Sequence, residues 1–543
     1  MSQALSSQAA AKPGPQPVDV LIVGAGFAGL CMLHKARCQG LNARVIEAAD
    51  GVGGTWFHNR YPGARVDIQS MEYSFGFDDA LQQDWHWTER YAAQPELLRY
   101  ANHVADRFAL RDGIQFNTRL AGAAFDEAAQ RWLAHAQGGQ SWSARFMVMA
   151  CGPLSSPNQP DFTGLSDYAG QVLHTARWPL EAVDFSGLRV GVIGTGSSAV
   201  QAIPVIARQA AQLTVFQRTA TYAVPARNGP LDADFEAAIK ADYPGFRAAN
   251  QRMMGGFGSL QPPNRISALA VSDAEREALF EARWQVGGFG LLGAFNDLIV
   301  NPAANELASE FVRNKIRATV HDPATAERLC PSHPIGCKRL CIDSGYYASF
   351  NLPNVALVDL QHAPIEGFTP QGLVAGGTAH RFDALVLATG FDAMTGTLLK
   401  LDLRGRGGLR LQDHWRAGPL NYLGLTISGF PNLFNVAGPG STSAFTNVMV
   451  SIEHHINWIA NCIAYLDAKG LATIDATAEA EADYVAHVNQ VAARTIYLNC
   501  NSWYLGANIP GKPRMFMPLF GYPAYAEKCA EVVAQGYAGF VLA

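Results

Sequence analysis

Residues 18–29 read VDVLIVGAGFAG, an apolar stretch followed by three glycines in the order G-x-G-x-x-G. This pattern is typical of a buried strand that turns tightly into a helix and there receives a dinucleotide. The first glycine makes the turn, the second lets a pyrophosphate approach the backbone, and the third lets the helix pack closely on the strand. Since helix N-termini bind phosphate, we expect the contacts to come from Gly24, Gly26, Phe27, Ala28 and Gly29.

A second copy of the pattern lies at residues 188–199, LRVGVIGTGSSA, with Ala199 at the third position, which needs only a small residue. Each copy has an apolar strand before it and a helical stretch after it, a context that chance glycine turns lack. The repeat predicts an α/β fold with two Rossmann-like dinucleotide-binding domains. The second domain is expected to bind its ligand through Gly194, Thr195, Gly196, Ser197 and Ser198.

The end of the next strand distinguishes the two ligands. Glu47 lies 23 residues after Gly24, where a carboxylate can accept hydrogen bonds from a ribose diol. The same offset in the second copy brings Gln217, followed by Arg218 and Thr219. A carboxylate would repel a 2′-phosphate, whereas Arg can bind it by charge-assisted hydrogen bonds. The first domain therefore suits FAD or NAD, and the second suits NADPH.

The chain is expected to cross between the two domains after two further apolar strands, at 146–152 and 384–390, which both end in a glycine turn. Amphipathic spacing at 303–320 and 273–285 predicts a mostly helical insertion. The NADP domain is thus inserted in the FAD domain. The expected order is a disordered tail at 1–17, the first FAD-domain segment at 18–150, the first NADP-domain segment at 153–224, the helical insertion at 225–333, the second NADP-domain segment at 334–383 and the second FAD-domain segment at 386–543.

Composition and charge exclude several classes of protein. The 543-residue chain is 49% hydrophobic, which excludes a disordered protein, and its formal charge of −5 argues against a nucleic-acid-binding surface. No apolar run approaches the ~20 residues that span a bilayer, and the N-terminus lacks the apolar core of a secretory signal. The nine cysteines are odd in number and lack metal-ligand spacing, which favours a reducing cytoplasm and no bound metal.

A segment between the two glycine motifs carries a family resemblance. Residues 168–179, YAGQVLHTARWP, resemble the fingerprint F-x-G-x-x-x-H-x-x-x-W-P of the Baeyer–Villiger monooxygenases, with Tyr168 in place of the usual Phe. The matching positions are Gly170, His174, Trp178 and Pro179. For His174, which lies between the domains by motif position, a structural or domain-motion role is favoured over acid–base chemistry.

Four other segments resemble this family: the flavin-contacting loop at 53–67, the active-site Arg segment at 336–347, a second FAD-contacting loop at 438–447 and the C-terminal motif at 501–514, whose Trp contacts the nicotinamide cofactor. The resemblance implies cofactor contacts at Gly54, Thr55, Trp56, Asp67, Tyr73, Lys338, Arg339, Gly438 and Trp503. It also implies a substrate pocket that includes Ser443, Ala444, Phe445 and Val448.

The resemblance implies an FAD- and NADPH-dependent enzyme that converts ketones, cyclic ones above all, with O2 into esters or lactones through a C4a-peroxyflavin. A fixed cation is needed where negative charge develops, and Arg339 is the candidate because guanidinium stays protonated. Asp67 is expected to orient Arg339. Lys338 is expected to share the 2′-phosphate with Arg218.

Three alternatives compete with this function. A flavin-dependent N- or S-monooxygenase usually ends the fingerprint with an aromatic residue and Lys instead of Trp178 and Pro179, although sulfoxidation could accompany ketone oxidation. A pyridine nucleotide–disulfide reductase needs a close cysteine pair after the first motif, which is missing. A nucleotide-binding sensor without catalysis would have lost a charged active-site residue, whereas Asp67, Lys338 and Arg339 all remain. The ketone and the oligomeric state stay open.

Overall fold

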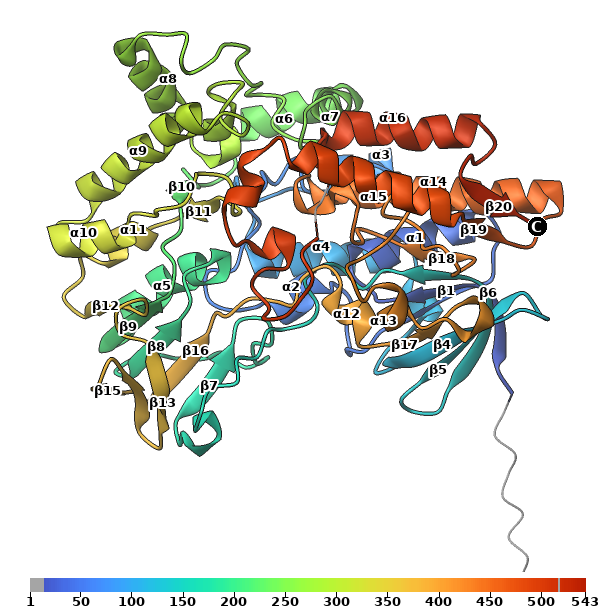
Figure 1. Cartoon of the computed structure of the whole chain (residues 1–543), viewed down its shortest axis with the longest axis horizontal. Coiled ribbons are helices and arrows are strands. Elements are labelled where there is room, and N and C mark those ends of the chain that lie inside the picture. Colours follow the sequence, from blue (N-terminus) through green and yellow to red (C-terminus); the bar gives the residue numbers. More distant parts are fainter. Residues whose placement is uncertain (1–13, 516–517) are drawn as a thin grey trace, which may run out of the picture.

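The first glycine motif lies in an eight-stranded sheet of the computed structural model, which describes residues 14–515 and 518–543 (Figure 1). The strand order is β17-β4-β5-β6-β1-β2-β3, and β18 pairs with β6. β1 is parallel to both β2 and β6, and its Val20, Leu21 and Ile22 are fully buried. The strands are β1 (Gln16–Val23), β2 (Ala43–Ile46), β3 (Ile114–Gln115), β4 (Leu120–Asp126), β5 (Arg131–Ala136), β6 (Ser141–Met149), β17 (Asp402–Arg404) and β18 (Leu433–Asn435).

The second glycine motif lies in a separate five-stranded sheet, which is parallel throughout in the order β12-β9-β8-β16-β7. One mixed and one parallel sheet, each with a glycine turn at the end of an inner parallel strand, confirm the predicted α/β fold class. The strands are β7 (Gln171–His174), β8 (Arg189–Ile193), β9 (Gln212–Gln217), β12 (Val355–Asp359) and β16 (Ala384–Leu387).

The structure corrects two predicted boundaries. β16 pairs with β7 and β8, so it belongs to the second sheet, and the boundary predicted between 383 and 386 comes too early. The predicted tail at 1–17 is too long, because β1 begins at Gln16 and pairs along β6 from there. Backbone pairing extends the strand past its apolar residues, which is why the apolar pattern misplaced its start. Residues 1–13 lie outside the described residues.

Smaller sheets complete the strand inventory. An antiparallel three-stranded sheet flanks the second nucleotide unit, and β10 pairs in parallel with β11, which follows the Lys338–Arg339 segment. The strands are β10 (Ala223–Pro225), β11 (Cys341–Asp343), β13 (Ile365–Thr369), β14 (Gly372–Ala375), β15 (Thr378–Arg381), β19 (Ile474–Ala476) and β20 (Phe540–Leu542).

Helices surround the sheets and fill the region between β10 and β11. In Figure 1, α8, α9 and α10 lie at one end of the molecule, and α14, α15 and α16 cover the first sheet. The helices are α1 (Phe27–Cys38), α2 (Thr55–His58), α3 (Asp79–Asp84), α4 (Gln94–Arg107), α5 (Ser197–Gln209), α6 (Ala233–Ala241), α7 (Tyr243–Gln251), α8 (Asp273–Val286), α9 (Pro302–Thr319), α10 (Pro323–Leu329), α11 (Tyr346–Ser349), α12 (Gly396–Leu399), α13 (Leu411–His414), α14 (Val448–Lys469), α15 (Ala478–Ala492) and α16 (Gly521–Ala534).

Short 3-10 turns connect these elements and contribute residues to the site described below. They are η1 (Arg111–Gly113), η2 (Leu165–Asp167), η3 (Gly288–Gly293), η4 (Arg406–Gly408), η5 (Thr442–Ala444), η6 (Ile496–Asn499) and η7 (Trp503–Leu505). Within the described residues, no helix combines the length and apolar composition that crossing a bilayer requires.

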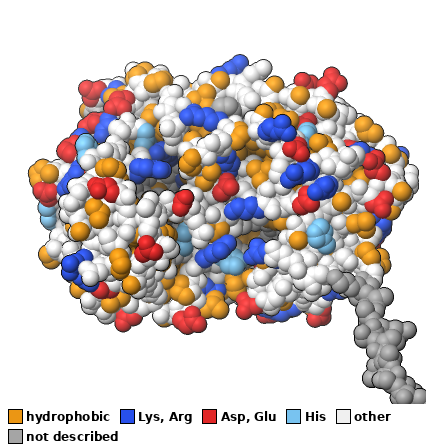
Figure 2. Space-filling view, turned by 60° about the horizontal axis from the view of Figure 1, so that its bottom comes forward, with side chains coloured by type: hydrophobic (Ala, Val, Ile, Leu, Met, Phe, Trp, Pro, Cys, Tyr) orange, Lys and Arg blue, Asp and Glu red, His pale blue; other side chains and the backbone are white. Residues whose placement is uncertain are grey.

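Acidic and basic side chains are mixed over the face in Figure 2, and several Lys and Arg side chains border hollows at its middle. The described residues of this face form no continuous basic strip of the kind that tracks a nucleic-acid backbone, which agrees with the slightly acidic net charge.

Candidate active site

The first glycine turn is fixed by close backbone contacts. Gly24 has φ +106°, and a Cβ there would lie 2.7 Å from the Ala150 carbonyl oxygen. A Cβ on Gly29 would lie 1.8 Å from the Gly24 carbonyl oxygen, so no other residue fits without moving the helix. Gly26 is the N-cap of α1 with no side-chain cap, which leaves the N-terminal N–H groups of Phe27 and Ala28 available to an anion.

The flavin-loop segment predicted at 53–67 lies directly opposite this turn. A Cβ on Gly54 would lie 3.0 Å from the Gly26 Cα, and the Gly53 N–H donates to the Ala25 carbonyl at 3.0 Å. The two backbones thus form a cradle that side chains would fill. Thr55 and Trp56 begin α2 beside it.

Aromatic side chains line the wall next to this cradle. The Trp56 indole Nε1 donates to the Tyr73 hydroxyl at 3.3 Å, and the Tyr73 ring packs edge-on against Phe27 with centroids 6.1 Å apart. Burial raises the pKa of the Tyr73 hydroxyl well above its usual value, although the Trp56 hydrogen bond opposes the shift. Trp56, Tyr73 and Phe27 are all buried.

Glu47 stands at the end of β2, where the ribose-binding carboxylate was predicted. Its Oε2 accepts from the Ala25 N–H at 2.6 Å, and its Oε1 accepts from the Ala49 N–H at 2.8 Å. The carboxylate is therefore tied to the first glycine turn. Each oxygen keeps further acceptor capacity for ligand hydroxyl groups.

The second glycine turn is more open than the first. Gly194 has φ +110° and approaches the Ala388 carbonyl, but a Cβ on Gly196 would meet nothing within 4 Å. Ser197 and Ser198 begin α5 with no side-chain cap, and the Thr195 hydroxyl donates to the Thr219 carbonyl at 2.8 Å. The open space above Gly196 suits a pyrophosphate at the helix N-terminus.

Two cations stand together beyond this turn. Arg218 follows β9 and is exposed, and Lys338 is half-buried. Burial lowers the pKa of Lys338, and the positive charge of Arg218 lowers it further, so the two side chains repel each other. Neither forms an ion pair with an acidic side chain of the described chain. A dianionic phosphate between them would relieve that repulsion.

Arg339 and Asp67 form the central ion pair of the site. The Arg339 Nε and Nη2 donate to the two Asp67 carboxylate oxygens at 2.7 Å each, and Nη1 donates to the Ala444 carbonyl at 3.1 Å. The guanidinium carbon lies 5.3 Å from the ring centroid of Phe289, and the Tyr504 hydroxyl is a further hydrogen-bond partner. Burial alone would lower the Arg339 pKa, but the Asp67 carboxylate more than offsets it, so the pKa lies above its usual value.

A cavity of about 250 Å³ opens beside Arg339 and Asp67. That volume far exceeds the ~10–15 Å³ that one water needs, so the cavity has room for an organic ligand. Its walls come from the helical insertion, η3 and the C-terminal turns, and include Met254, Phe257, Phe289, Phe445, Tyr497 and Tyr504. Most of these residues carry no motif, so sequence reasoning missed them; only their aromatic character hinted at a role.

Of the predicted pocket residues, Phe445 lines this cavity and packs on Tyr504 with centroids 4.4 Å apart. Ala444 contributes its carbonyl to Arg339 instead of a cavity wall. Val448 begins α14 and packs partly buried on the main hydrophobic core. The side chain of Ser443 lies outside the described residues.

Two cofactor candidates remain, Gly438 and Trp503. Gly438 follows β18 at the carboxyl edge of the first sheet, and its carbonyl accepts from the Ser441 hydroxyl at 2.7 Å. Trp503 begins η7, is half-buried and contacts Tyr504 with ring centroids 4.4 Å apart. Trp503 therefore stands one residue from a cavity wall.

Known proteins resemble this chain over nearly its whole length. A family model described as pyridine nucleotide-disulphide oxidoreductase matches residues 21–240. A phenazine N-monooxygenase of Lysobacter antibioticus is 41% identical over 96% of this chain and 97% of its own. A Baeyer–Villiger monooxygenase of Pseudooceanicola batsensis is 41% identical over 96% of each chain. The chain belongs to the Baeyer–Villiger monooxygenase family. A solved structure of an oxidised steroid monooxygenase bound to NADP is 50% identical, covers 97% of this chain and 99% of that chain, and superposes with a TM-score of 0.93.

Membership in the Baeyer–Villiger family makes this protein an FAD- and NADPH-dependent enzyme that oxygenates ketones with O2. The structure fits both cofactors. The Gly26–Gly54 cradle and the carboxylate of Glu47 suit FAD at the first sheet. The open turn at Gly196 and the unpaired cations Arg218 and Lys338 suit NADPH at the second.

The Baeyer–Villiger fingerprint lies at the crossing between the two sheets. A Cβ on Gly170 would lie 2.2 Å from the Tyr168 hydroxyl oxygen, and Trp178 is buried, followed by Pro179. The His174 Nδ1 accepts from the Ala176 N–H at 3.1 Å, and Nε2 lies 3.2 Å from the Asn158 carbonyl oxygen. Burial lowers the His174 pKa, so a neutral ring bridges the first crossing segment to β7.

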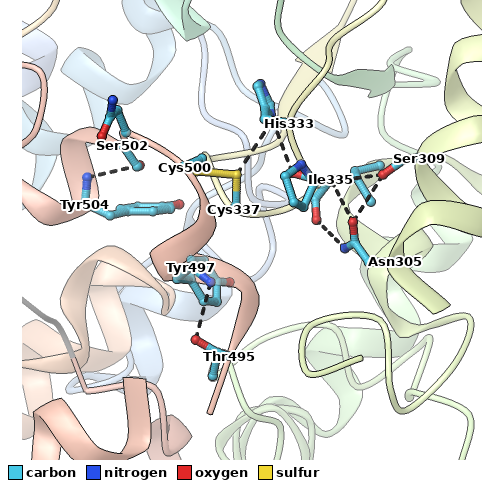
Figure 3. Close-up of a disulfide and its surroundings, with 12 residues drawn as sticks. Asn305, Ser309, His333, Ile335, Cys337, Thr495, Tyr497, Cys500, Ser502 and Tyr504 are labelled. Carbon is cyan, nitrogen blue, oxygen red and sulfur yellow. Dashed lines mark hydrogen bonds between the residues drawn. A yellow bond between two sulfur atoms is a disulfide. The ribbon is translucent and has the colours of Figure 1, made fainter. Parts of the chain in front are cut away.

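The cysteines depart from the expected reduced state. Cys337 and Cys500 form a disulfide, whereas the other cysteines of the described chain are free (Figure 3). Their separation of 163 residues hid the pair, because no sequence pattern indicates which distant thiols meet.

Proposed function

We propose that this enzyme converts cyclic ketones into lactones, with Arg339 as the catalytic cation and Asp67 as the residue that positions it. The observation that carries the proposal is the two-point Arg339–Asp67 ion pair at the wall of an apolar cavity. Asp67 and the Ala444 carbonyl accept from three of the five N–H donors of the guanidinium, so one N–H on each Nη stays available to an oxygen that gains negative charge.

The cofactor, Arg339 and the aromatic side chains of the cavity each contribute differently to the reaction. Bound FAD, reduced by NADPH, supplies activated dioxygen as the nucleophile toward the ketone carbon. Arg339 hydrogen bonds the developing oxyanion, and it keeps its own proton because Asp67 raises its pKa. The rings of Phe289 and Phe445 exclude water from the cavity and thereby strengthen these charge interactions.

NADPH is proposed to dock through the second sheet. The pyrophosphate is held over Gly196 at the start of α5, and Arg218 and Lys338 bind the 2′-phosphate from two sides. Trp503 and the fingerprint residue His174 contact no reacting atom in this scheme. Trp503 orients the cofactor, and His174 holds the interdomain crossing.

The cyclic substrate class rests on the shape and lining of the cavity. Broad aromatic walls suit a rigid apolar ring, and the similar steroid monooxygenase acts on a fused-ring class of compound by its name. The free cysteines Cys31, Cys151, Cys341, Cys462 and Cys529 have no bridge and are mostly buried, and we propose a cytoplasmic location.

A second candidate activity is N-oxygenation of a flat nitrogen heterocycle. One of the most similar curated relatives is a phenazine N-monooxygenase, at the same identity as the Baeyer–Villiger relative. An aromatic-lined cavity also suits a flat aromatic ring, so the cavity does not by itself separate the two activities.

The test is a panel of substrates with products identified by mass and by fragmentation. The panel contains cycloalkanones from small to macrocyclic, a steroid ketone, a linear ketone and a phenazine. We expect lactones from the cyclic ketones and the highest kcat/KM among them. N-oxide from the phenazine with no ester from any ketone would overturn the proposal in favour of N-oxygenation.

A further inference from the structure

The disulfide joins the two segments that hold the active-site cation and the cofactor-side aromatic wall. Cys337 lies two residues before Arg339, and Cys500 lies between the cavity residues Tyr497 and Tyr504. The two Cα atoms are 6.3 Å apart (Figure 3). The bridge thus joins two segments that both contribute residues to the cavity wall.

The Cys337 side of the bridge is firmly anchored. The Ile335 N–H donates to the Asn305 Oδ1 at 3.0 Å and to the Ser309 Oγ at 3.1 Å, and both acceptors are buried on α9 (Figure 3). Arg339 is held by Asp67 a few residues later. This loop therefore keeps its place whether or not the sulfurs are bonded.

The Cys500 side makes few backbone hydrogen bonds to other segments and is held mainly by side-chain packing. The Ile496 N–H donates to the Ile299 carbonyl at 3.0 Å, and the Asn508 side chain donates to the Phe391 carbonyl at 2.8 Å. Between these two anchors, the backbone hydrogen bonds of the described chain stay within the segment itself or reach Met515. We call residues 497–507 the C-terminal strap. Its attachments to the cavity are the bridge and the aromatic and hydroxyl contacts of Tyr497 and Tyr504.

We propose that Cys337 and Cys500 are a reversible thiol–disulfide modification site that locks the C-terminal strap against the Arg339 loop. With the bridge closed, Tyr504 and Trp503 are kept over the cavity and the cofactor cleft. With the bridge open, the strap is free to move away, the cavity admits water, and NADPH is consumed with less ester formed. The consequence for catalysis rests on the proposed function; the thiol chemistry does not.

The reaction at this site is a two-electron exchange. Two thiols and one hydrogen peroxide give the disulfide and two waters. For reduction, one thiolate of a dithiol reductant attacks one sulfur, and the other cysteine leaves as a thiolate and takes a proton. The second thiol of the reductant then attacks the mixed disulfide and releases the first cysteine as a thiol, so the reductant ends as its own disulfide. Cys337 is fully buried and Cys500 is half-exposed, so attack falls on the Cys500 sulfur.

The leaving thiolate of Cys337 has a suitable neighbour. The His333 Nδ1 lies 3.7 Å from the Cys337 Sγ, close enough for an N–H at that nitrogen to donate a hydrogen bond to the leaving sulfur (Figure 3). A thiolate that is stabilised in this way leaves more readily. In a cytoplasmic enzyme, a disulfide of this kind is transient rather than constitutive.

The first test measures the thiols directly on the full-length holoenzyme. Protein exposed to stoichiometric hydrogen peroxide is alkylated with iodoacetamide, digested and mapped by mass. We expect Cys337 and Cys500 to escape alkylation, to react after dithiothreitol, and to be protected again after a second exposure to peroxide. Alkylation of both residues after peroxide, or their pairing with other cysteines, would overturn the proposal.

The second test follows the strap itself. Limited proteolysis of oxidised and reduced protein should cut within 497–507 several-fold faster after reduction, because the strap then lacks its covalent tie. Cys500→Ser should be cut at the fast rate in both states, whereas Cys38→Ser, at an exposed free cysteine, should respond like wild type. Equal cutting of oxidised and reduced wild type would show that the bridge does not hold the strap.

The third test measures coupling. The ratio of ester formed to NADPH consumed should fall roughly two- to tenfold on reduction of wild type, and Cys500→Ser should show the low ratio with or without reductant. Cys38→Ser again serves as the matched control. A Cys500→Ser enzyme that still loses coupling on reduction would place the redox effect elsewhere. If no ketone is oxidised at all, the proposed function fails, while the thiol mapping still decides the proposal.

Discussion

Arg339 and Asp67 meet across 272 residues of sequence in a two-point hydrogen-bonded pair, with both N–O distances at 2.7 Å. The paired geometry fixes the plane of the guanidinium, which a single contact cannot do. Asp67 comes from the loop opposite the first glycine turn, and Arg339 precedes β11 at the edge of the helical insertion. The pair therefore joins the flavin side of the site to the nicotinamide side.

Replacing Arg339 with Ala should abolish ester formation while flavin reduction by NADPH remains measurable. The reason is that the cation acts on charge that develops in the transition state, and removal of one such donor typically costs about 10²–10³ in kcat. Stopped-flow absorbance measures the reduction, and mass analysis measures the ester. A normal lactone yield would remove Arg339 from the mechanism.

Arg339→Lys and Asp67→Asn separate charge from orientation. Lys keeps the charge but cannot make the two-point contact, so we expect activity well below wild type. Asn keeps the shape of Asp67 but loses its charge, so the guanidinium should tilt and kcat should fall more than KM rises. Equal activity of Arg339→Lys and wild type would show that a positive charge at this position is sufficient for catalysis and that the two-point contact with Asp67 is not required.

Arg218→Ala should weaken the binding of NADPH far more than the binding of NADH. The lost contact is a charge-assisted hydrogen bond to the 2′-phosphate, worth about 1.5–3 kcal/mol, which corresponds to a roughly ten- to hundredfold rise in the KM for NADPH. Lys338→Ala should act in the same direction, because the two cations stand together. Steady-state kinetics with both cofactors measures the ratio. An unchanged ratio of the two KM values in Arg218→Ala would mean that Arg218 does not contact the 2′-phosphate of NADPH.

The predictable features of this molecule are those that short motifs encode. The two glycine turns, the carboxylate at Glu47 and the cation at Arg218 follow from strand and turn chemistry, whereas Arg339 was predicted from the resemblance of its segment to a family motif. Backbone constraints at such turns allow few residue types, so the sequence pattern is informative.

The rest depends on long-range packing, which no local pattern encodes. Phe289 and Tyr504 contact Arg339 from segments that lie far from it in sequence. From the sequence alone, such aromatic residues are indistinguishable from residues of the hydrophobic core. The Cys337–Cys500 bridge was missed for the same reason.

Gly29→Ala and Gly196→Ala should have opposite phenotypes although they alter equivalent motifs. A Cβ on Gly29 would lie 1.8 Å from the Gly24 carbonyl, so the helix must shift, and a loss of about 3 kcal/mol in unfolding free energy is expected together with poor FAD retention. A Cβ on Gly196 meets nothing within 4 Å, so that variant should fold and keep FAD but bind NADPH weakly. Flavin content, thermal unfolding and the KM for NADPH measure the three effects.

If Gly29→Ala retained full flavin and wild-type stability, the close contact between Gly29 and the Gly24 carbonyl would be disproved. If Gly196→Ala lost flavin as well, the open space above the second turn would have to serve folding instead of ligand binding. The third position of the motif already differs between the two copies. The first copy has Gly29, where a Cβ would clash, whereas the second copy has Ala199, which is fully buried.

Glu72 is a buried carboxyl that links two segments of the cavity wall. Burial raises its pKa to about 7, and the Gly258 N–H, which donates to Oε1 at 2.7 Å, opposes the shift together with the charge of Arg90. Glu72 and Gly258 both line the cavity, so this hydrogen bond ties the insertion to the flavin-side segment.

The raised pKa predicts that wild type loses stability as the pH rises. In the unfolded chain Glu72 titrates near its ordinary value of 4.5, whereas in the folded protein it keeps its proton up to about pH 7. The folded state therefore binds more protons than the unfolded state between these values, and the contribution of Glu72 to stability, complete below pH 4.5, is lost by about pH 7. The loss amounts to about 3 kcal/mol.

Glu72→Gln should not lose this contribution, because Gln keeps an acceptor for the Gly258 N–H but does not ionise. The difference in unfolding free energy between the variant and wild type should therefore grow in favour of the variant from pH 5 to pH 7 and then stay constant. Urea unfolding at several pH values measures it. Glu277→Gln, at an exposed position on α8, is the control and should show no such trend. A Glu72→Gln protein that parallels wild type at every pH would mean that Glu72 is already ionised in the folded state and that its burial is offset by charges other than Arg90.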